Sequence, residues 1–173
     1  MLISKTMSSA LSTQVGNEFL ASLQYVAIAA YFDGESLPEL AARFYTQADE
    51  ERMHAMKLLK YVVGAGGSPE IPSIPAPQSR FGSAVDAVQC ALDHELRVTA
   101  QINELASLAK RESDHLSDGM LQWFVTEQLE EVSGMETLLK MVKRAGESGL
   151  LMVEDFLART KAAAPAPTGG PAA

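Results

Sequence analysis

One proline- and glycine-rich segment divides the chain and limits how its two halves can be joined. Residues 64–80, GAGGSPEIPSIPAPQSR, hold four prolines and three glycines, so they cannot form a regular helix or strand. On each side of this segment lie two long stretches with apolar residues at helical spacing, separated only by short turns. The sequence therefore predicts two helical hairpins joined by one long connection.

The expected helices cover about residues 5–32, 38–63, 83–110 and 116–145. In the first turn, DGESLPEL, Gly34 suits a left-handed helix end, and Ser36 can cap the next helix ahead of Pro38. A brief fifth helix is expected over GLLMVEDFLART. The last stretch, KAAAPAPTGGPAA, has the composition of a disordered tail.

Helices of this length, about 40 Å each, bury their apolar stripes best against one another. Short links favour antiparallel neighbours, whereas the long link can run the length of the molecule as a crossover. We therefore expect an all-α fold, a four-helix bundle with one long crossover and a short fifth C-terminal helix. The bundle forms one domain over residues 1–160, followed by a Pro/Ala-rich tail over residues 161–173.

Charge and composition narrow the function classes. A formal net charge of −8 argues against general nucleic-acid binding and fits a protein that attracts cations. The only cysteine, Cys90, excludes an internal disulfide and a thiolate zinc cluster, so a reducing compartment is expected. The longest apolar run, from Tyr25 to Phe32, is too short for a membrane span, and the N-terminus lacks an export pattern. The chain is accordingly predicted to be cytoplasmic, with no membrane partner.

Each long helix carries an acid in its apolar stripe near its middle. These acids are Glu18, Glu51, Glu95 and Glu131, and His54 follows Glu51 by three residues, so that both side chains project from one helix face. The stripes consist of Leu11, Val15, Ser22, Tyr25 and Ala29; Phe44, Ala48, Leu58 and Val62; Val88, Leu92, Val98 and Ile102; and Leu121, Phe124, Met135, Leu138 and Val142.

Carboxylates gathered in a low-dielectric core would take up protons or repel one another unless a cation lay between them. Glutamates from two helices together with a Glu-x-x-His unit form the known arrangement by which a bundle holds two iron ions. The fourth helix offers Gln128-x-x-Glu131 where the symmetric pattern has a second Glu-x-x-His, so the second metal would bind more weakly and could leave. One such motif alone usually lies on a solvated face; four inward acids together favour a metal site.

Four segments carry a resemblance to a known family. NEFLASLQYVAIAAYF, ADEERMHAMKL, HELRVTAQINELA and LQWFVTEQLEEV resemble the helix signatures of the prokaryotic non-haem ferritins, in order and spacing, across about residues 8–160. The resemblance implies a ferritin-like bundle in a homo-oligomeric cage, usually of twenty-four subunits. It also implies a ferroxidase that oxidises Fe(II) with O₂ or H₂O₂ and stores the iron as a ferric mineral.

The resemblance also implies roles for individual residues. Glu18 and His54 would hold the first iron, Glu51 would bridge, and Glu95 would hold the second iron. Gln128 resembles the glutamine that the family places on the oxidant side of the di-iron centre, and Tyr25 resembles the family's tyrosine beside that centre. Tyr25 lies seven residues after Glu18 and could donate an electron or hydrogen-bond a ligand; a merely buried tyrosine is the alternative. Trp123 is expected to be a core anchor.

Further acids match a third iron site on the path to the ferritin cavity. These are Glu50, Glu127 and Glu130, together with Glu131; an exposed acidic surface is the alternative. A looser match places Asp114, His115 and Asp118 where ferritins line channels at threefold axes. The fifth helix, with its apolar Leu150, Leu151, Val153, Phe156 and Leu157, is expected to pack in a subunit contact, which in ferritins is the fourfold axis.

Three alternatives remain. Bacterioferritins place a haem-binding methionine directly after the glutamate of Glu-x-x-His, where this chain has Arg52, and a histidine where it has Glu131, so no haem is expected. A di-metal enzyme acting on an organic substrate would usually have a second Glu-x-x-His. A purely structural cage subunit would be expected to lack one or more of the metal ligands.

Overall fold

A computed structural model describes residues 2–163, with side chains described through residue 160. In this part of the chain five α-helices and no strands occur: α1 (Lys5–Gly34), α2 (Pro38–Gly64), α3 (Ala84–Arg111), α4 (His115–Ala145) and α5 (Leu150–Ala163), with a 3-10 turn, η1 (Glu147–Gly149), before α5. The all-α prediction is confirmed, and the long helices end within two residues of the expected boundaries. The predicted tail begins at residue 161, yet α5 continues to Ala163; residues 164–173 lie outside the described residues.

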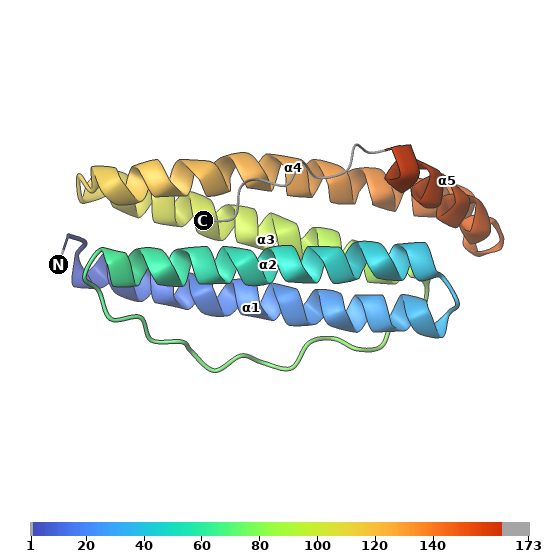
Figure 1. The fold of residues 1–173 in the computed structure, drawn as a ribbon, viewed down its shortest axis with the longest axis horizontal. Coiled ribbons are helices and arrows are strands. Elements are labelled where there is room, and N and C mark those ends of the chain that lie inside the picture. Colours follow the sequence, from blue (N-terminus) through green and yellow to red (C-terminus); the bar gives the residue numbers. More distant parts are fainter. Residues whose placement is uncertain (1, 164–173) are drawn as a thin grey trace.

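The four long helices form two antiparallel hairpins, α1 with α2 and α3 with α4 (Figure 1). The connection between α2 and α3 runs along the outside of the bundle, as the crossover predicted from its prolines. The Gln24 side chain holds this connection, because it donates to Gln78 O at 2.8 Å and accepts from Gln78 N at 2.9 Å. Pro72 lies directly on Gly16, where a Cβ atom would be 2.3 Å from Pro72 Cγ, so no larger residue fits there.

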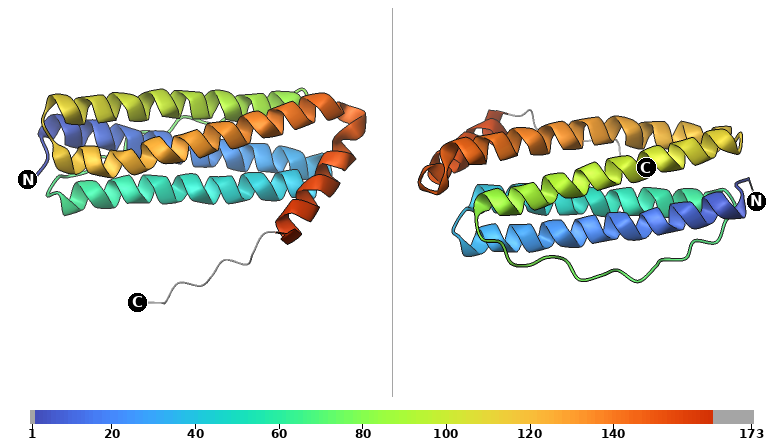
Figure 2. Two further views of the ribbon diagram at one scale, coloured as in Figure 1. Left: turned by 90° about the horizontal axis from the view of Figure 1, so that it is seen from above. Right: turned by 180° about the vertical axis from the view of Figure 1, so that it is seen from behind.

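Helix α5 leaves the end of α4 and lies at an angle to the bundle axis (Figure 2). Leu150 and Val153 are buried against the bundle, whereas Leu151, Met152 and Phe156 are exposed on the other side of the helix. The apolar surface of this helix is therefore only partly used within the subunit. The expected subunit contact stays a prediction.

The turn between α1 and α2 differs from the expectation. Ser36, rather than Gly34, has the left-handed conformation, with φ of 59°, and Leu37 is the N-cap of α2 without a side-chain hydrogen bond. The buried Glu154 of α5 caps α2 instead, because its carboxylate accepts from Glu39 N and Leu40 N, each at 2.8 Å. A carboxylate at a helix N-terminus satisfies free N–H groups and complements the helix dipole.

The core consists of two apolar clusters separated along the bundle. One gathers at the α5 end around Phe32, Phe44 and Leu138, and the other at the opposite end around Leu11, Leu58 and Phe124. The middle of each long helix contributes polar side chains between these clusters. Among the described helices, none combines the length and apolar content that crossing a bilayer requires.

Candidate metal centre

Two overlapping groups of ligands lie between the apolar clusters. Glu18, Glu51 and His54 offer ligand atoms that lie within 4.8 Å of one another, and Glu51, Glu95 and Glu131 do the same. Glu51 belongs to both groups, so its two oxygens can face two cations at once. The structure thus brings together the inward acids of all four helices.

Glu51 and His54 project together because they lie three residues apart on α2. His54 Nδ1 is 3.2 Å from Glu51 Oε2, and both side chains are buried. Burial lowers the pKa of His54, but the hydrogen bond and charge of Glu51, with the charge of Glu18, outweigh it and raise that pKa to about 9. A cation binding at this imidazole must therefore displace a proton.

Glu18 is fully buried on α1, and its carboxylate is only half satisfied. Oε1 accepts from Gln14 Nε2 at 2.9 Å, whereas Oε2 has no hydrogen-bond partner among the described residues. Burial first, and the neighbouring Glu51 second, raise the pKa of Glu18 well above its ordinary value. A buried carboxylate oxygen without a partner, aimed at other acids, fits a cation ligand.

Glu95 on α3 is buried and has two hydrogen-bond donors. The Tyr25 hydroxyl donates to Oε1, and Gln128 Nε2 donates to Oε2 at 3.1 Å. Burial and the charge of Glu51 nevertheless raise the pKa of Glu95 to about 8. Burial, followed by the charge of Glu95, also raises the pKa of Tyr25 well above its usual value, so the phenol stays a donor.

Gln128 of α4 is buried beside the second group with its amide nitrogen toward Glu95, and its predicted place near the oxidant stays a prediction. The same Nε2 also donates to Thr99 Oγ1 at 3.1 Å and to the main-chain oxygen of Glu95 at 3.2 Å. In this orientation Gln128 holds Glu95, and only a turned amide would present oxygen to a cation.

Glu131 completes the second group from α4. Burial and the charge of Glu51 raise its pKa to about 7, while a hydrogen bond from Gln47 lowers it. Gln47 Nε2 donates to Glu131 Oε2 at 2.6 Å and to Glu51 Oε1 at 3.1 Å, so one amide joins two helices.

The sequence reasoning missed Gln14 and Gln47. Each lies four residues before a site glutamate and donates to it, so a Gln-x-x-x-Glu pattern on α1 and on α2 is the signal that would have found them. It also missed His94, a buried neighbour of Tyr25 that accepts from Arg97 Nη2 at 3.1 Å. Burial and Arg97 lower the pKa of His94 to about 4.

The predicted third-site acids line a cleft beside the centre. Glu50, Glu127 and Glu130 lie with Glu131 and His54 around a hollow of about 490 Å³ between α2 and α4. Burial and the charge of Glu51 raise the pKa of the half-buried Glu50. The cleft therefore gives the buried ligands an acidic route to solvent.

Trp123 also lines this cleft, and the prediction that it anchors the core is wrong. Its side chain is 37% exposed, its ring meets His54 edge-on at 5.4 Å, and Lys57 Nζ lies 3.0 Å from its centroid. Arg52, which stands where bacterioferritins have the haem methionine, is exposed. The absence of haem stays a prediction.

The weakly matched channel residues lie at the start of α4. Asp114 is the N-cap, accepting from Ser117 N at 3.0 Å, and His115 is exposed beside it. Asp118 accepts from Gln122 at 3.2 Å. Its role as N-cap is enough to explain an aspartate at position 114, and a channel at this place stays a prediction.

A four-helix bundle with one long crossover and with inward carboxylates from all four helices is the arrangement of the ferritin-like class of proteins. A sequence model of the ferritin-like domain matches residues 8–145. The chain belongs to the ferritin family.

Relatives and solved structures extend this result. The chain is 49% identical over 160 residues to "Ferritin BfrB" of Mycolicibacterium smegmatis, covering 92% of this chain and 88% of that protein. It is 34% identical over 146 residues to the "Bacterial non-heme ferritin" of Staphylococcus aureus, covering 84% and 88%. An open pore ferritin from Archaeoglobus fulgidus superimposes with a TM-score of 0.87 at 32% identity, covering 90% of this chain and 97% of that chain.

Proposed function

We propose that the protein is a ferroxidase that stores iron. Two Fe(II) ions bind at the overlapping positions, and each loses one electron to the same oxidant. O₂ takes the two electrons and two protons to become H₂O₂, or H₂O₂ takes them to become two water molecules. Because both electrons are supplied together, no free oxygen radical is released.

The shared Glu51 is the observation that carries this proposal. It lies in both ligand groups, so the two ions are held close to one carboxylate. Glu18 and His54 complete the first position, and Glu95 and Glu131 the second. Carboxylates stabilise Fe(III) more than Fe(II), because the higher charge interacts more strongly with anionic oxygen, and this favours oxidation.

Product iron leaves through the acidic cleft. The second position has no imidazole among its grouped ligands, and Gln128 and Tyr25 hydrogen-bond to the Glu95 carboxylate, so iron competes with these donors for it. Glu50, Glu127 and Glu130 offer the next oxygens outward, as a third iron site. Tyr25 steadies Glu95 through its hydrogen bond, or supplies the second electron to the oxidant when only one position holds Fe(II).

Storage requires assembly into a cage of identical subunits, which we take to number twenty-four as the family resemblance implies. The exposed apolar side of α5 supports a subunit contact there, and the similarity to an open pore ferritin supports a shell. With its single cysteine, the protein is expected to work in a reducing compartment, the cytoplasm.

A double substitution, Glu18→Ala with His54→Ala, tests the ferroxidase. It should abolish fast Fe(II) oxidation, followed by ferric absorbance under air, while size-exclusion chromatography shows an unchanged native mass. Asp49→Ala is the matched control, because Asp49 is exposed on α2. Unchanged oxidation in an assembled double variant would refute the site assignment.

The same measurements separate the alternatives. A di-metal enzyme for an organic substrate should run as a small oligomer, whereas a cage runs at hundreds of kilodaltons. A structural subunit should assemble but oxidise no Fe(II), where the proposal expects two Fe(II) per subunit in the fast phase.

A triple substitution of Glu50, Glu127 and Glu130 by alanine tests the third site. The first oxidation should stay nearly intact, because Glu18, Glu51, His54 and Glu95 are kept. The ratio of iron oxidised to oxygen consumed should change. An unchanged ratio would leave these acids as exposed surface.

A further inference from the structure

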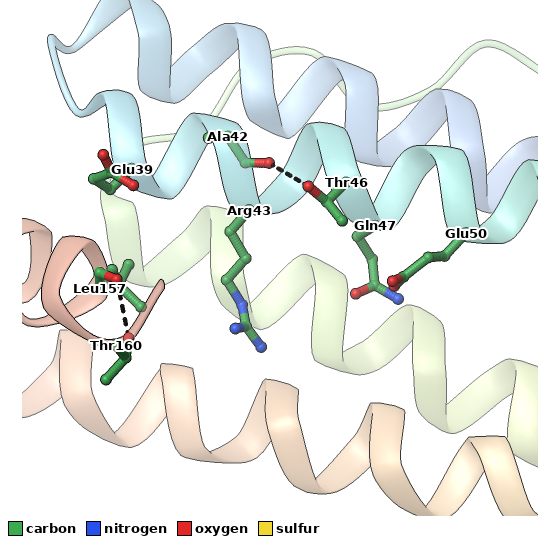
Figure 3. Close-up of a pocket in the computed structure, with 8 residues that line it drawn as sticks. All are labelled: Glu39, Ala42, Arg43, Thr46, Gln47, Glu50, Leu157 and Thr160. Atoms are coloured by element: carbon green, nitrogen blue, oxygen red, sulfur yellow. Dashed lines mark hydrogen bonds between the residues drawn. The ribbon is translucent and has the colours of Figure 1, made fainter. Parts of the chain in front are cut away.

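A second hollow lies next to the acidic cleft, between α2 and α5 (Figure 3). Its volume is about 460 Å³, and its lining includes Glu39, Arg43, Thr46 and Gln47 of α2 and Thr160 of α5, with the carboxylate of Glu39 at the end opposite Glu50 along α2. Glu50 lines both hollows, so they adjoin along α2. Gln47 and Glu50 border the metal centre and the acidic cleft, whereas Arg43, Thr46 and Thr160 have no role in the proposed oxidation chemistry.

Arg43 presents a guanidinium there with one buried N–H group, Nε, that has no acceptor among the described residues. Its guanidinium extends from α2 toward α4 (Figure 3), where a Cβ at Gly134 would be 3.4 Å from Arg43 Nη2. Arg43 Nε is buried and has no acceptor among the described residues, and Arg43 takes part in none of their ion pairs. A buried N–H group of a charged side chain without an acceptor is strongly destabilising, so an acceptor from outside the chain is expected.

The neighbouring polar groups already have partners. Thr46 Oγ1 donates to Ala42 O at 3.0 Å, and the amide of Gln47 is turned toward Glu51 and Glu131. The charge of Arg43 acts on Glu50 through space, lowering the pKa of that acid against the larger effect of burial. The guanidinium is therefore the donor that remains for a small anion.

We propose that Arg43 binds a tetrahedral oxyanion in this hollow, with inorganic phosphate as the probe. The planar guanidinium presents parallel N–H groups at the spacing of oxyanion oxygens, which a lysine does not. The hollow holds phosphate together with water. Bound phosphate lies beside the Glu50 end of the acidic cleft, where ferric iron leaving the centre meets a ligand for mineral growth; this last step alone rests on the proposed function.

Equilibrium dialysis of iron-free, assembled protein against radiolabelled phosphate tests the anion site. Wild-type protein should show saturable binding in each subunit. Arg43→Gln should weaken it by about tenfold to a hundredfold, the effect of losing a charge-assisted hydrogen-bonding pair. Arg43→Lys should fall between them, because it keeps the charge without the planar fork. Arg52→Gln, an equal charge change at an exposed position of α2, should bind as wild type does.

Absence of saturable binding to wild-type protein would overturn the proposal, and so would equal losses in Arg43→Gln and Arg52→Gln. Native mass is measured for each variant; if Arg43→Gln does not assemble, wild-type affinity in Arg43→Lys would equally overturn it. The test needs no iron, so failure of Fe(II) oxidation leaves its outcome unchanged. Conversely, loss of the anion site leaves the ferroxidase proposal standing.

Discussion

The two candidate ligand groups share Glu51 but differ in what surrounds their other members. At the first, Glu18 keeps one oxygen without a partner, and His54 adds a nitrogen. At the second, both oxygens of Glu95 accept hydrogen bonds, from Tyr25 and Gln128. An unpartnered buried oxygen gains most from a cation, whereas a satisfied one must exchange donors for it. The difference predicts a tight first position and a weaker second position.

Removing the shared ligand should have the largest effect. Glu51→Gln takes a carboxylate from both positions, so Fe(II) oxidation should fall by about a hundredfold or more, given that even outer partners of ligands are worth about 10- to 100-fold. Initial rates under air measure this, with exposed Asp49→Asn as the control on the same helix. A fall below tenfold would mean that the two positions do not depend on one carboxylate.

Substitutions of the unshared acids distinguish the positions. With Zn²⁺, which binds without redox chemistry, wild-type protein should show a tight and a weaker event in calorimetry. Glu18→Gln should weaken the tight event by about a hundredfold, and Glu95→Gln should remove mainly the weaker one. The reverse assignment would contradict the inference drawn from the hydrogen bonds.

The stability of the metal-free protein should depend on pH because of the same buried acids and histidine. In the folded protein the pKa of Glu95 is raised to about 8, so as pH rises above its unfolded value the unfolded state ionises while the folded state keeps the proton. The pKa of His54 is raised to about 9, and the stability it contributes below its unfolded value is lost as pH rises through 9. The Glu95 effect builds up between about pH 4.5 and 8 and the His54 effect between about pH 6.5 and 9, so both destabilise the folded protein between about pH 6.5 and 8.

The melting temperature of metal-free protein should therefore be lower at pH 9 than at pH 6.5, by more than about 5 °C. Differential scanning fluorimetry measures this. In the Glu95→Gln variant, whose residue 95 cannot ionise, the melting temperature should depend less on pH. In wild-type protein, saturating Zn²⁺ should make the melting temperature rise with pH, because the metal binds the deprotonated ligands. If the melting temperature falls equally with pH in wild type and in Glu95→Gln, the ionisation of Glu95 does not cause the pH dependence.

Local periodicity was enough to predict much of this arrangement. Glu18, Glu51 and Glu95 interrupt apolar stripes, and a helix translates such spacing directly into a shared face. Trp123 was misjudged because it precedes the stripe residue Phe124, and a step of one residue turns it about 100° from the core.

Contacts between distant segments were beyond this reasoning. Glu154 caps α2 from 115 residues away in place of Ser36, and no helical period relates those positions. The buried Nε of Arg43 likewise depends on how α2 packs against its neighbours. Sequence spacing specifies which face a side chain occupies on its own helix, but not which group it meets across an interface.

The smallest effects are expected from substituting the two glutamines, Gln14 and Gln128, whose amides donate to Glu18 and Glu95. Gln14→Leu removes the single donor to Glu18, and Gln128→Leu removes a donor to Glu95 that also contacts Thr99. Losing Gln14 raises the pKa of Glu18 further, because its hydrogen bond lowers that pKa, so proton competition should weaken the tight Zn²⁺ event by about tenfold near neutral pH.

For Gln128→Leu two outcomes have different meanings. If the amide only holds Glu95, its loss raises the pKa of that acid, because the Gln128 hydrogen bond lowers it. The weaker Zn²⁺ event should then weaken at pH 7 but recover as pH rises above 8, where protons no longer compete. If the amide turns and supplies its oxygen to the ion, the same substitution should weaken that event at both pH values. Calorimetry at pH 7 and at pH 8.5 therefore decides whether Gln128 acts on the second position as a donor to Glu95 or as a ligand.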